Sequence, residues 1–154
     1  MRFTIIIALF VSSIFTSNSA MATTWDIPTY PLWVGPHLNF NFGSKQLEMS
    51  LGLEASYWFV QKDTLPIGGV CIGTEYNFQK DKFVTYTQGQ LGAMFVGSSF
   101  GVVYDQEKGF GAQTSIWANL FAGAIFHYRY FNTDSTDKII GGYAKIPAWE
   151  DSKK

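Results

Sequence analysis

A strict alternation of apolar and polar residues over residues 46–59 constrains the fold of this chain more than any other feature. Every odd position from Leu47 to Phe59 is apolar, whereas every even position except Trp58 is polar or glycine. Because successive side chains of a β-strand point to opposite faces, this segment predicts a strand with one apolar and one polar face. Its fourteen residues exceed the roughly five or six of an average strand.

Weaker versions of the same alternation recur along the chain, separated by short polar or glycine-containing turns. They predict seven more strands: His37–Phe42, Ile67–Phe78, Phe83–Val96, Ser99–Gln106, Gly109–Trp117, Leu120–Phe131 and Lys138–Pro147. Connections this short pair each strand with its neighbour in sequence. Eight long strands in such a meander have two open edges, and closure removes both. The predicted fold is therefore all-β, an up-and-down antiparallel β-barrel of about eight strands.

The first 22 residues predict a secretory signal peptide that is removed. Arg2 precedes an apolar run over residues 3–11, and Ala20 and Ala22 supply the small residues of a cleavage site. The apolar run is too short to remain as a membrane-spanning anchor. Removal leaves 132 residues, the size of one domain. The predicted organisation is a signal peptide at 1–22, a flexible lead-in at 23–33, the barrel at 34–149 and a tail at 150–154.

Charge and cysteine content exclude several classes of protein. Loss of Arg2 moves the formal net charge from −1 to −2, so a basic nucleic-acid-binding surface is not expected. No stretch after residue 22 has the ~18 consecutive apolar residues of a transmembrane helix. Cys71 is the only cysteine, so an internal disulfide does not hold the exported chain together.

Two observations indicate that the apolar faces of the strands point outward, into lipid. Charged residues make up 15% of the chain, below the ~25% of soluble domains, whereas aromatic residues make up 18%. Aromatic side chains also gather at the predicted strand ends, as in the girdles of membrane barrels. They include Tyr57, Phe59, Tyr76, Phe78, Tyr128 and Tyr130. The alternative, with apolar faces inward, predicts a secreted soluble barrel of the lipocalin or avidin kind that binds an apolar ligand.

With the apolar faces outward, the polar faces line the lumen, and we assign five charged residues to them. These are Glu48, Glu54, Glu75, Arg129 and Lys145, and His127 lies on the same faces. An eight-stranded barrel is only wide enough to be filled by its own side chains. Carboxylates in such a space need cationic partners. We therefore predict an ionic network of these six residues, in which Arg129 pairs with Glu54 or Glu75.

In pattern and length, the segment from Val34 to Trp149 resembles the small eight-stranded outer-membrane barrels of Gram-negative bacteria, the class of OmpX and the OmpA transmembrane domain. The resemblance rests on alternation, strand number and size rather than on a motif. It implies a monomer in the outer membrane whose partner is membrane lipid, with a structural or surface-interaction role and no nucleic-acid partner. Such barrels often end in an aromatic residue, whereas this chain continues for five residues beyond Trp149.

Motifs for catalysis and metal binding are absent from the sequence. There is no phosphate-binding loop and no HExxH zinc motif. His37 and His127 lie on separate predicted strands without the spacing of metal ligands, so neither a metal nor another cofactor is expected. Outer-membrane lipid-modifying enzymes on such a scaffold carry a serine two residues after a histidine, but Arg129 occupies that position here. We therefore expect no enzyme, and a lipid-modifying enzyme is the third hypothesis.

Overall fold

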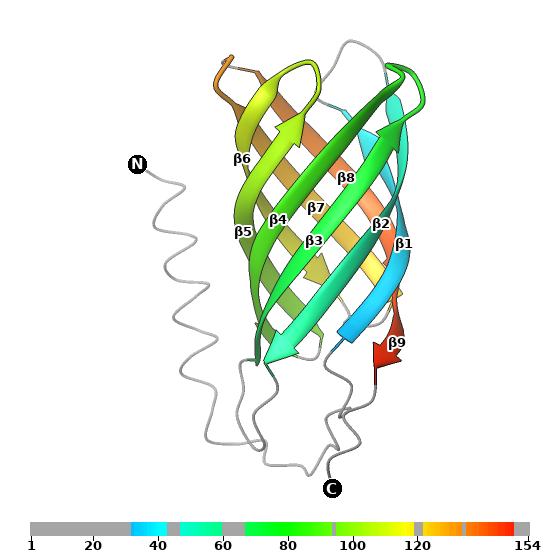
Figure 1. The fold of residues 1–154 in the computed structure, drawn as a ribbon, viewed down its shortest axis with the longest axis vertical. Coiled ribbons are helices and arrows are strands. Elements are labelled where there is room, and N and C mark those ends of the chain that lie inside the picture. Colours follow the sequence, from blue (N-terminus) through cyan, green and yellow to red (C-terminus); the bar gives the residue numbers. More distant parts are fainter. Residues whose placement is uncertain are drawn as a thin grey trace, which may run out of the picture.

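The computed structural model describes residues 32–42, 47–59, 67–93, 95–118, 122–133 and 135–149, which form one closed antiparallel β-barrel (Figure 1). Consecutive strands lie side by side, so the predicted up-and-down fold is confirmed. The strands are β1 Leu32–Asn41, β2 Glu48–Phe59, β3 Ile67–Asn77, β4 Lys82–Ala93, β5 Val96–Asp105, β6 Gly109–Ala118, β7 Ala122–Phe131, β8 Thr136–Ala144 and β9 Ile146–Trp149. Among the residues that the structure describes, no helix is long and apolar enough to cross a membrane.

The barrel closes because β1 pairs with β2 on one side and with β8 on the other. The pairing can be followed around the barrel from Leu32 on β1. It passes through Tyr57, Val70, Gly89, Phe100, Thr114, Tyr128 and Lys138. It ends at Phe42, whose N–H donates to the Lys138 carbonyl oxygen at 2.8 Å, ten residues along the chain from Leu32. A stagger of this kind tilts barrel strands by about 40° from the axis, and Figure 1 shows the slanted strands.

The last strand of the barrel is interrupted opposite Pro36. β8 pairs with β1 as far as Tyr143, and β9 resumes the pairing at Ile146, so β8 and β9 together form one side of the barrel. Proline has no N–H to donate to the ladder, which accounts for a break at this position. Gly35 fits the close approach of the strands there, because an added Cβ would lie 1.8 Å from the carbonyl oxygen of Ala144.

Side chains alternate between the outside and the lumen along the strands, and the apolar side chains point outward. On β2, Leu51 and Leu53 are 49% and 59% exposed, whereas Glu48 and Glu54 are buried. The predicted direction of the two faces is therefore correct. Among the outward-facing residues of the described strands, Lys138 on β8 is the only one with a charged side chain.

Aromatic side chains form a ring around the outside of one end of the barrel. This upper end in Figure 1 carries the β3–β4, β5–β6 and β7–β8 turns, and the lower end carries the start of β1 and the end of β9. The upper aromatic ring, as we call it, consists of Phe42, Tyr76, Phe78, Phe83, Tyr104, Phe110 and Tyr130. Neighbouring rings are in contact, with centroids 5.1 Å apart for Tyr76 and Phe83 and 5.0 Å for Tyr104 and Phe110.

A cluster of tryptophans fills the lower end of the lumen. Trp33, Trp58 and Trp117 pack with Ile125, and the Trp58 and Trp117 rings meet edge to face at 5.7 Å. Glycine opposite a large ring makes this packing possible, because an added Cβ at Gly97 would lie 2.0 Å from the Trp117 ring. The lumen is therefore apolar at its lower end, where the sequence had placed only Trp58 among the inward aromatic side chains.

The structure also moves several predicted boundaries. β1 begins at Leu32 rather than His37. The last two residues of the predicted lead-in at 23–33 therefore belong to the barrel. The sequence pattern missed this extension because Gly35 and Pro36 are ordinarily strand breakers. The predicted strand at 83–96 ends at Ala93, and Val96 already belongs to β5. The predicted signal peptide at 1–22 and the tail at 150–154 lie outside the described residues.

The packing around Trp117 leads to a prediction about two glycines. Gly97→Ala should destabilise the barrel by about 1–3 kcal/mol, because the new methyl group would overlap the indole ring. Gly89→Ala is the matched control, since an added Cβ there points outward and meets its nearest atom at 3.9 Å. Unfolding by denaturant in detergent micelles measures both. Equal stabilities for the two variants would contradict the packing described here.

Candidate functional site

The centre of the lumen is organised around the carboxylate of Glu75 on β3. Its Oε1 accepts a hydrogen bond from Arg129 Nη1 on β7 at 2.5 Å. Its Oε2 accepts one from Asn39 Nδ2 at 2.6 Å and lies 3.3 Å from His37 Nε2, both on β1. All four side chains are buried. Of the two partners predicted for Arg129, the structure therefore selects Glu75, whose charge is balanced and whose two oxygens are both bonded.

A chain of side-chain hydrogen bonds runs from Arg129 across the neighbouring strands. Arg129 Nε donates to Gln113 Oε1 at 2.5 Å, and Gln113 Nε2 lies 3.2 Å from His127 Nδ1. The same histidine nitrogen lies 2.7 Å from Ser115 Oγ, which accepts from Gln88 Nε2 at 3.0 Å. All of these side chains are buried, so the chain gives partners to polar groups that water does not reach.

A second buried carboxylate, Glu54 on β2, lies nearer the seam between β1 and β9. Tyr86 donates its hydroxyl to Glu54 Oε2 at 2.6 Å, and Lys145 pairs with Oε1. Lys145 also donates to Ser56 Oγ at 2.8 Å. Because Lys145 lies between β8 and β9, this ion pair reaches across β1 to β2 and ties together the strands that close the barrel.

Two turns at the upper end are built in the same way and each positions a lysine. Asn77 Oδ1 accepts hydrogen bonds from the backbone N–H groups two and three residues later, those of Gln79 at 3.1 Å and Lys80 at 3.0 Å. Asp105 Oδ1 does the same in the following turn, where the N–H of Lys108 lies at 3.1 Å. Such side-chain-to-backbone bonds fix tight turns. In each turn, the residue three positions after the Asn or Asp is a lysine, and the hydrogen bond to its N–H fixes its backbone position.

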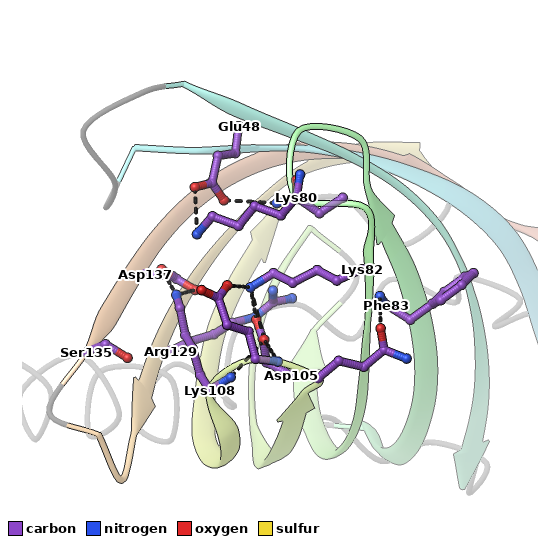
Figure 2. A network of polar contacts seen from close by, with 12 residues as sticks. Glu48, Lys80, Lys82, Phe83, Asp105, Lys108, Arg129, Ser135 and Asp137 are labelled. Carbon is purple, nitrogen blue, oxygen red and sulfur yellow. Dashed lines mark hydrogen bonds and ion pairs between the residues drawn. The ribbon is translucent and has the colours of Figure 1, made fainter.

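Ion pairs of these lysines cover the mouth of the lumen at the upper end. Figure 2 shows Lys80 with Glu48, Lys82 with Asp105, and Lys108 with Asp137, at N–O distances of 2.8, 2.8 and 2.6 Å. Lys108 extends from the β5–β6 turn to β8, so it crosses two strands. Each acid in the mouth has a cation beside it, which balances the charge of the group.

Glu107, in the exposed β5–β6 turn, adds an exposed acid to the ion pairs at the mouth of the lumen. Its carboxylate lies 2.9 Å from Lys82 Nζ. The hydrogen bond and positive charge of Lys82 hold the pKa of Glu107 below its usual range. Lys82 is thereby shared between a buried acid, Asp105, and an exposed one.

The space left within the upper lumen is small. A cavity of about 10 Å³ lies among the charged side chains of the mouth and of the centre, including Glu75, Asp105, Arg129 and Asp137. That volume is close to the minimum needed for one water molecule. Around this cavity the upper lumen is filled by side chains, as expected for a barrel of eight strands.

The six residues predicted to form an ionic network do not form one cluster. Glu75 meets Arg129, Glu54 meets Lys145, and Glu48 meets Lys80. His127 bonds to neutral partners. Four further charged residues point into the lumen or its mouth, although none was predicted there. These are Lys82, Asp105, Lys108 and Asp137. Three of them fall in predicted turns, and Asp105 was overlooked near the end of the predicted strand Ser99–Gln106. The parity of Lys82 with Val84, Tyr86 and Gln88 is the signal that could have found one of them.

Ser115 and His127 are brought together although no sequence motif connects them. They face each other across β6 and β7, and the distance of 2.7 Å is typical of a nucleophile and its base. Both are 1% exposed, and neither borders the cavity of the upper lumen. Cys71 is also buried, with its Sγ 3.8 Å from Gln88 Oε1. All three groups are therefore buried within the side-chain packing of the lumen.

Comparison with known proteins supports the fold alone. No protein-family model matches the chain, and no curated protein matches it. A solved structure with a similar fold, from work described as "De novo design of transmembrane beta-barrels", is 12% identical with a TM-score of 0.50. The match covers 79% of this chain and 98% of that one. No sequence match therefore supports the predicted resemblance to the OmpX and OmpA class. The structure and the similar solved structure do support an eight-stranded barrel.

The pair at the centre of the lumen can be tested by a double-mutant cycle. Arg129→Met should cost about 3–5 kcal/mol, because it leaves the buried carboxylate of Glu75 without its cation. Adding Glu75→Gln should recover much of that loss. Glu54→Gln is the control, since Glu54 pairs with Lys145 and should not rescue the Arg129 variant. Unfolding in detergent micelles provides the free energies, and additive losses for Arg129 and Glu75 would contradict the pairing.

Proposed function

We propose that the protein is an integral outer-membrane β-barrel with a lumen closed by its own side chains and with a non-enzymatic structural or surface-interaction role. The observation that carries this proposal is the outer surface of the barrel. Within the described strands, that surface is apolar apart from threonine and serine, and Lys138 is its only charged side chain. Soluble domains ordinarily carry about a quarter to a third of charged residues on their surface, so this surface suits lipid.

The dimensions of the barrel also suit a bilayer. The eight principal strands contain 9 to 12 residues each. At ~3.4 Å per residue and a tilt of about 40°, they span roughly 25–30 Å, which matches the apolar band of about 25 Å on outer-membrane barrels. The upper aromatic ring bounds this band at one end, where aromatic girdles of membrane barrels lie.

The filled lumen argues against the two other hypotheses. A secreted barrel that binds an apolar ligand needs an interior space of hundreds of Å³, whereas the cavity in the upper lumen is about 10 Å³ and is lined mainly by polar and charged residues. A lipid-modifying enzyme needs a nucleophile that its substrate can reach. Ser115 and His127 are buried instead in the hydrogen-bond chain of the lumen.

The location in the outer membrane rests on the predicted signal peptide at 1–22 together with the barrel. Export through a cleaved signal followed by insertion of a closed barrel leads to an outer membrane rather than an inner one. Closure leaves none of the eight principal strands with an unpaired edge for another chain, which supports a monomer with membrane lipid as its partner.

Two leucines on the same face of the same chain segment provide a matched test. Leu53 lies in the middle of β2 and Leu47 lies just before its upper end, and the two are 59% and 56% exposed. Leu53→Arg should cost about 2–4 kcal/mol and Leu47→Arg about 0–1 kcal/mol, because the cost of arginine in a bilayer falls toward the interface. Insertion into phosphatidylcholine vesicles, scored as protein that resists carbonate extraction, measures the difference.

If both arginine variants and the parent protein remain in the carbonate supernatant, the membrane proposal is wrong. Equal insertion of the two variants would show that the outward face of β2 does not contact the bilayer interior.

A further inference from the structure

Lys138 stands apart from the other lysines at the upper end of the barrel. Lys80, Lys82 and Lys108 all turn toward the lumen mouth, and each is paired with an acid. Lys138 instead faces outward from β8 and, within the described residues, makes no ion pair with an acid. An unpaired cation on an otherwise apolar surface is unusual, because burial of an unpaired charge in lipid is costly. An anionic group outside the protein would therefore stabilise the ammonium of Lys138.

The position of Lys138 is level with the upper aromatic ring. Its carbonyl oxygen accepts a hydrogen bond from the N–H of Phe42, a member of that ring. Tyr128 lies directly opposite it on β7, and the next outward-facing pair toward the upper end is Tyr130 with Thr136. In a membrane barrel, this level is the boundary between the acyl chains and the headgroups. A lysine there can extend its ammonium toward the headgroups while its methylene stem covers apolar surface.

The residues around Lys138 have different chemistry above and below it. Two neighbours carry hydroxyl groups: Thr136, two residues nearer the upper end on β8, and Tyr128, the residue paired with Lys138 on β7. Below it, Ile140 and Phe126 pair across β7 and β8 and are 52% and 41% exposed. A cation with hydroxyl donors above an apolar surface is complementary to a molecule with an anionic head and a hydrocarbon tail.

We propose that Lys138, with Tyr128 and Thr136, forms a binding site for the phosphate of an anionic glycerophospholipid whose acyl chain packs against Ile140 and Phe126. This inference rests on the proposed function, because it places the outer surface in a bilayer. The ammonium provides the charge attraction and the hydroxyl groups donate hydrogen bonds to phosphate oxygens. One cation near an anionic headgroup contributes about 1 kcal/mol, which corresponds to roughly a fivefold change in affinity.

Native mass spectrometry of the full mature chain in neutral detergent tests this site. The probes are dimyristoylphosphatidylglycerol and dimyristoylphosphatidylcholine, titrated separately, and the first lipid adduct is quantified. We expect the parent protein to bind phosphatidylglycerol more tightly than phosphatidylcholine. Lys138→Gln should weaken the first phosphatidylglycerol adduct about fivefold and leave the phosphatidylcholine adduct unchanged, and Lys138→Arg should retain the preference. Inorganic phosphate at equal concentration should not compete, because it lacks the acyl chain.

Lys80→Gln is the matched control, since it removes the same charge from the same end of the barrel but from a lysine that pairs with Glu48. An equal loss of phosphatidylglycerol in the Lys80 and Lys138 variants would overturn the site in favour of a general charge effect. So would an unchanged Lys138→Gln protein, or a parent protein with no lipid preference. These outcomes are separate from failure of the membrane proposal, in which the parent protein would not insert into phosphatidylcholine vesicles at all.

Discussion

A strand in a closed barrel has only two directions for its side chains, and eight strands enclose too little space for a water-filled interior. This steric constraint governs the rest of the structure. Several large inward side chains have a glycine as their neighbour on the adjoining strand. An added Cβ at Gly73 would lie 2.3 Å from Tyr86, and one at Gly141 would lie 1.9 Å from Asn39. At these positions glycine makes room in the lumen for the large side chain beside it.

The same constraint determines where charges can be tolerated. A buried carboxylate without a partner is expensive, so each acid in the described lumen lies beside a basic side chain. Two of the pairs connect strands that are not neighbours: Glu75 on β3 with Arg129 on β7, and Glu54 on β2 with Lys145 between β8 and β9. They thus give the barrel links through its interior in addition to the backbone ladder around its wall. The tryptophans at the lower end fill the remaining space without charge.

The recurring alternation, clearest in β2, was sufficient to predict the strands and the barrel, because a period of two is a local property. The direction of the faces followed from the low charge content and the aromatic residues at the strand ends. Which residues pair across the lumen was harder to predict from the sequence. Arg129 had two candidate partners, and choosing Glu75 required the register of five strands from β3 to β7, which short turns do not fix to one residue. The contact between Ser115 and His127 was not predicted for the same reason, because it depends on the register between β6 and β7.

The direction of charged side chains at the strand ends also could not be predicted from the sequence. Lys82 and Asp105 lie where strands meet turns, and polar residues at such positions are ordinarily solvated. In this barrel the turns fold their polar groups back over the mouth, and Asn77 and Asp105 hold the turns in that shape. The spacing of an Asn or Asp followed three residues later by lysine occurs in both turns and is visible in the sequence once its role is known.

The central claim, that the alternating outer face contacts lipid and the inner face is packed, is tested most directly by a spin-label scan along β2. Single nitroxide labels at successive positions from Leu47 to Phe59, in protein reconstituted into phospholipid vesicles, report their access to oxygen and to a water-soluble nickel complex. The account predicts high oxygen access and low nickel access at Leu51, Leu53 and Ala55, with low access to both reagents at Ser50, Glu54 and Ser56. High nickel access at Leu51 and Leu53 would place that face in water and contradict the account.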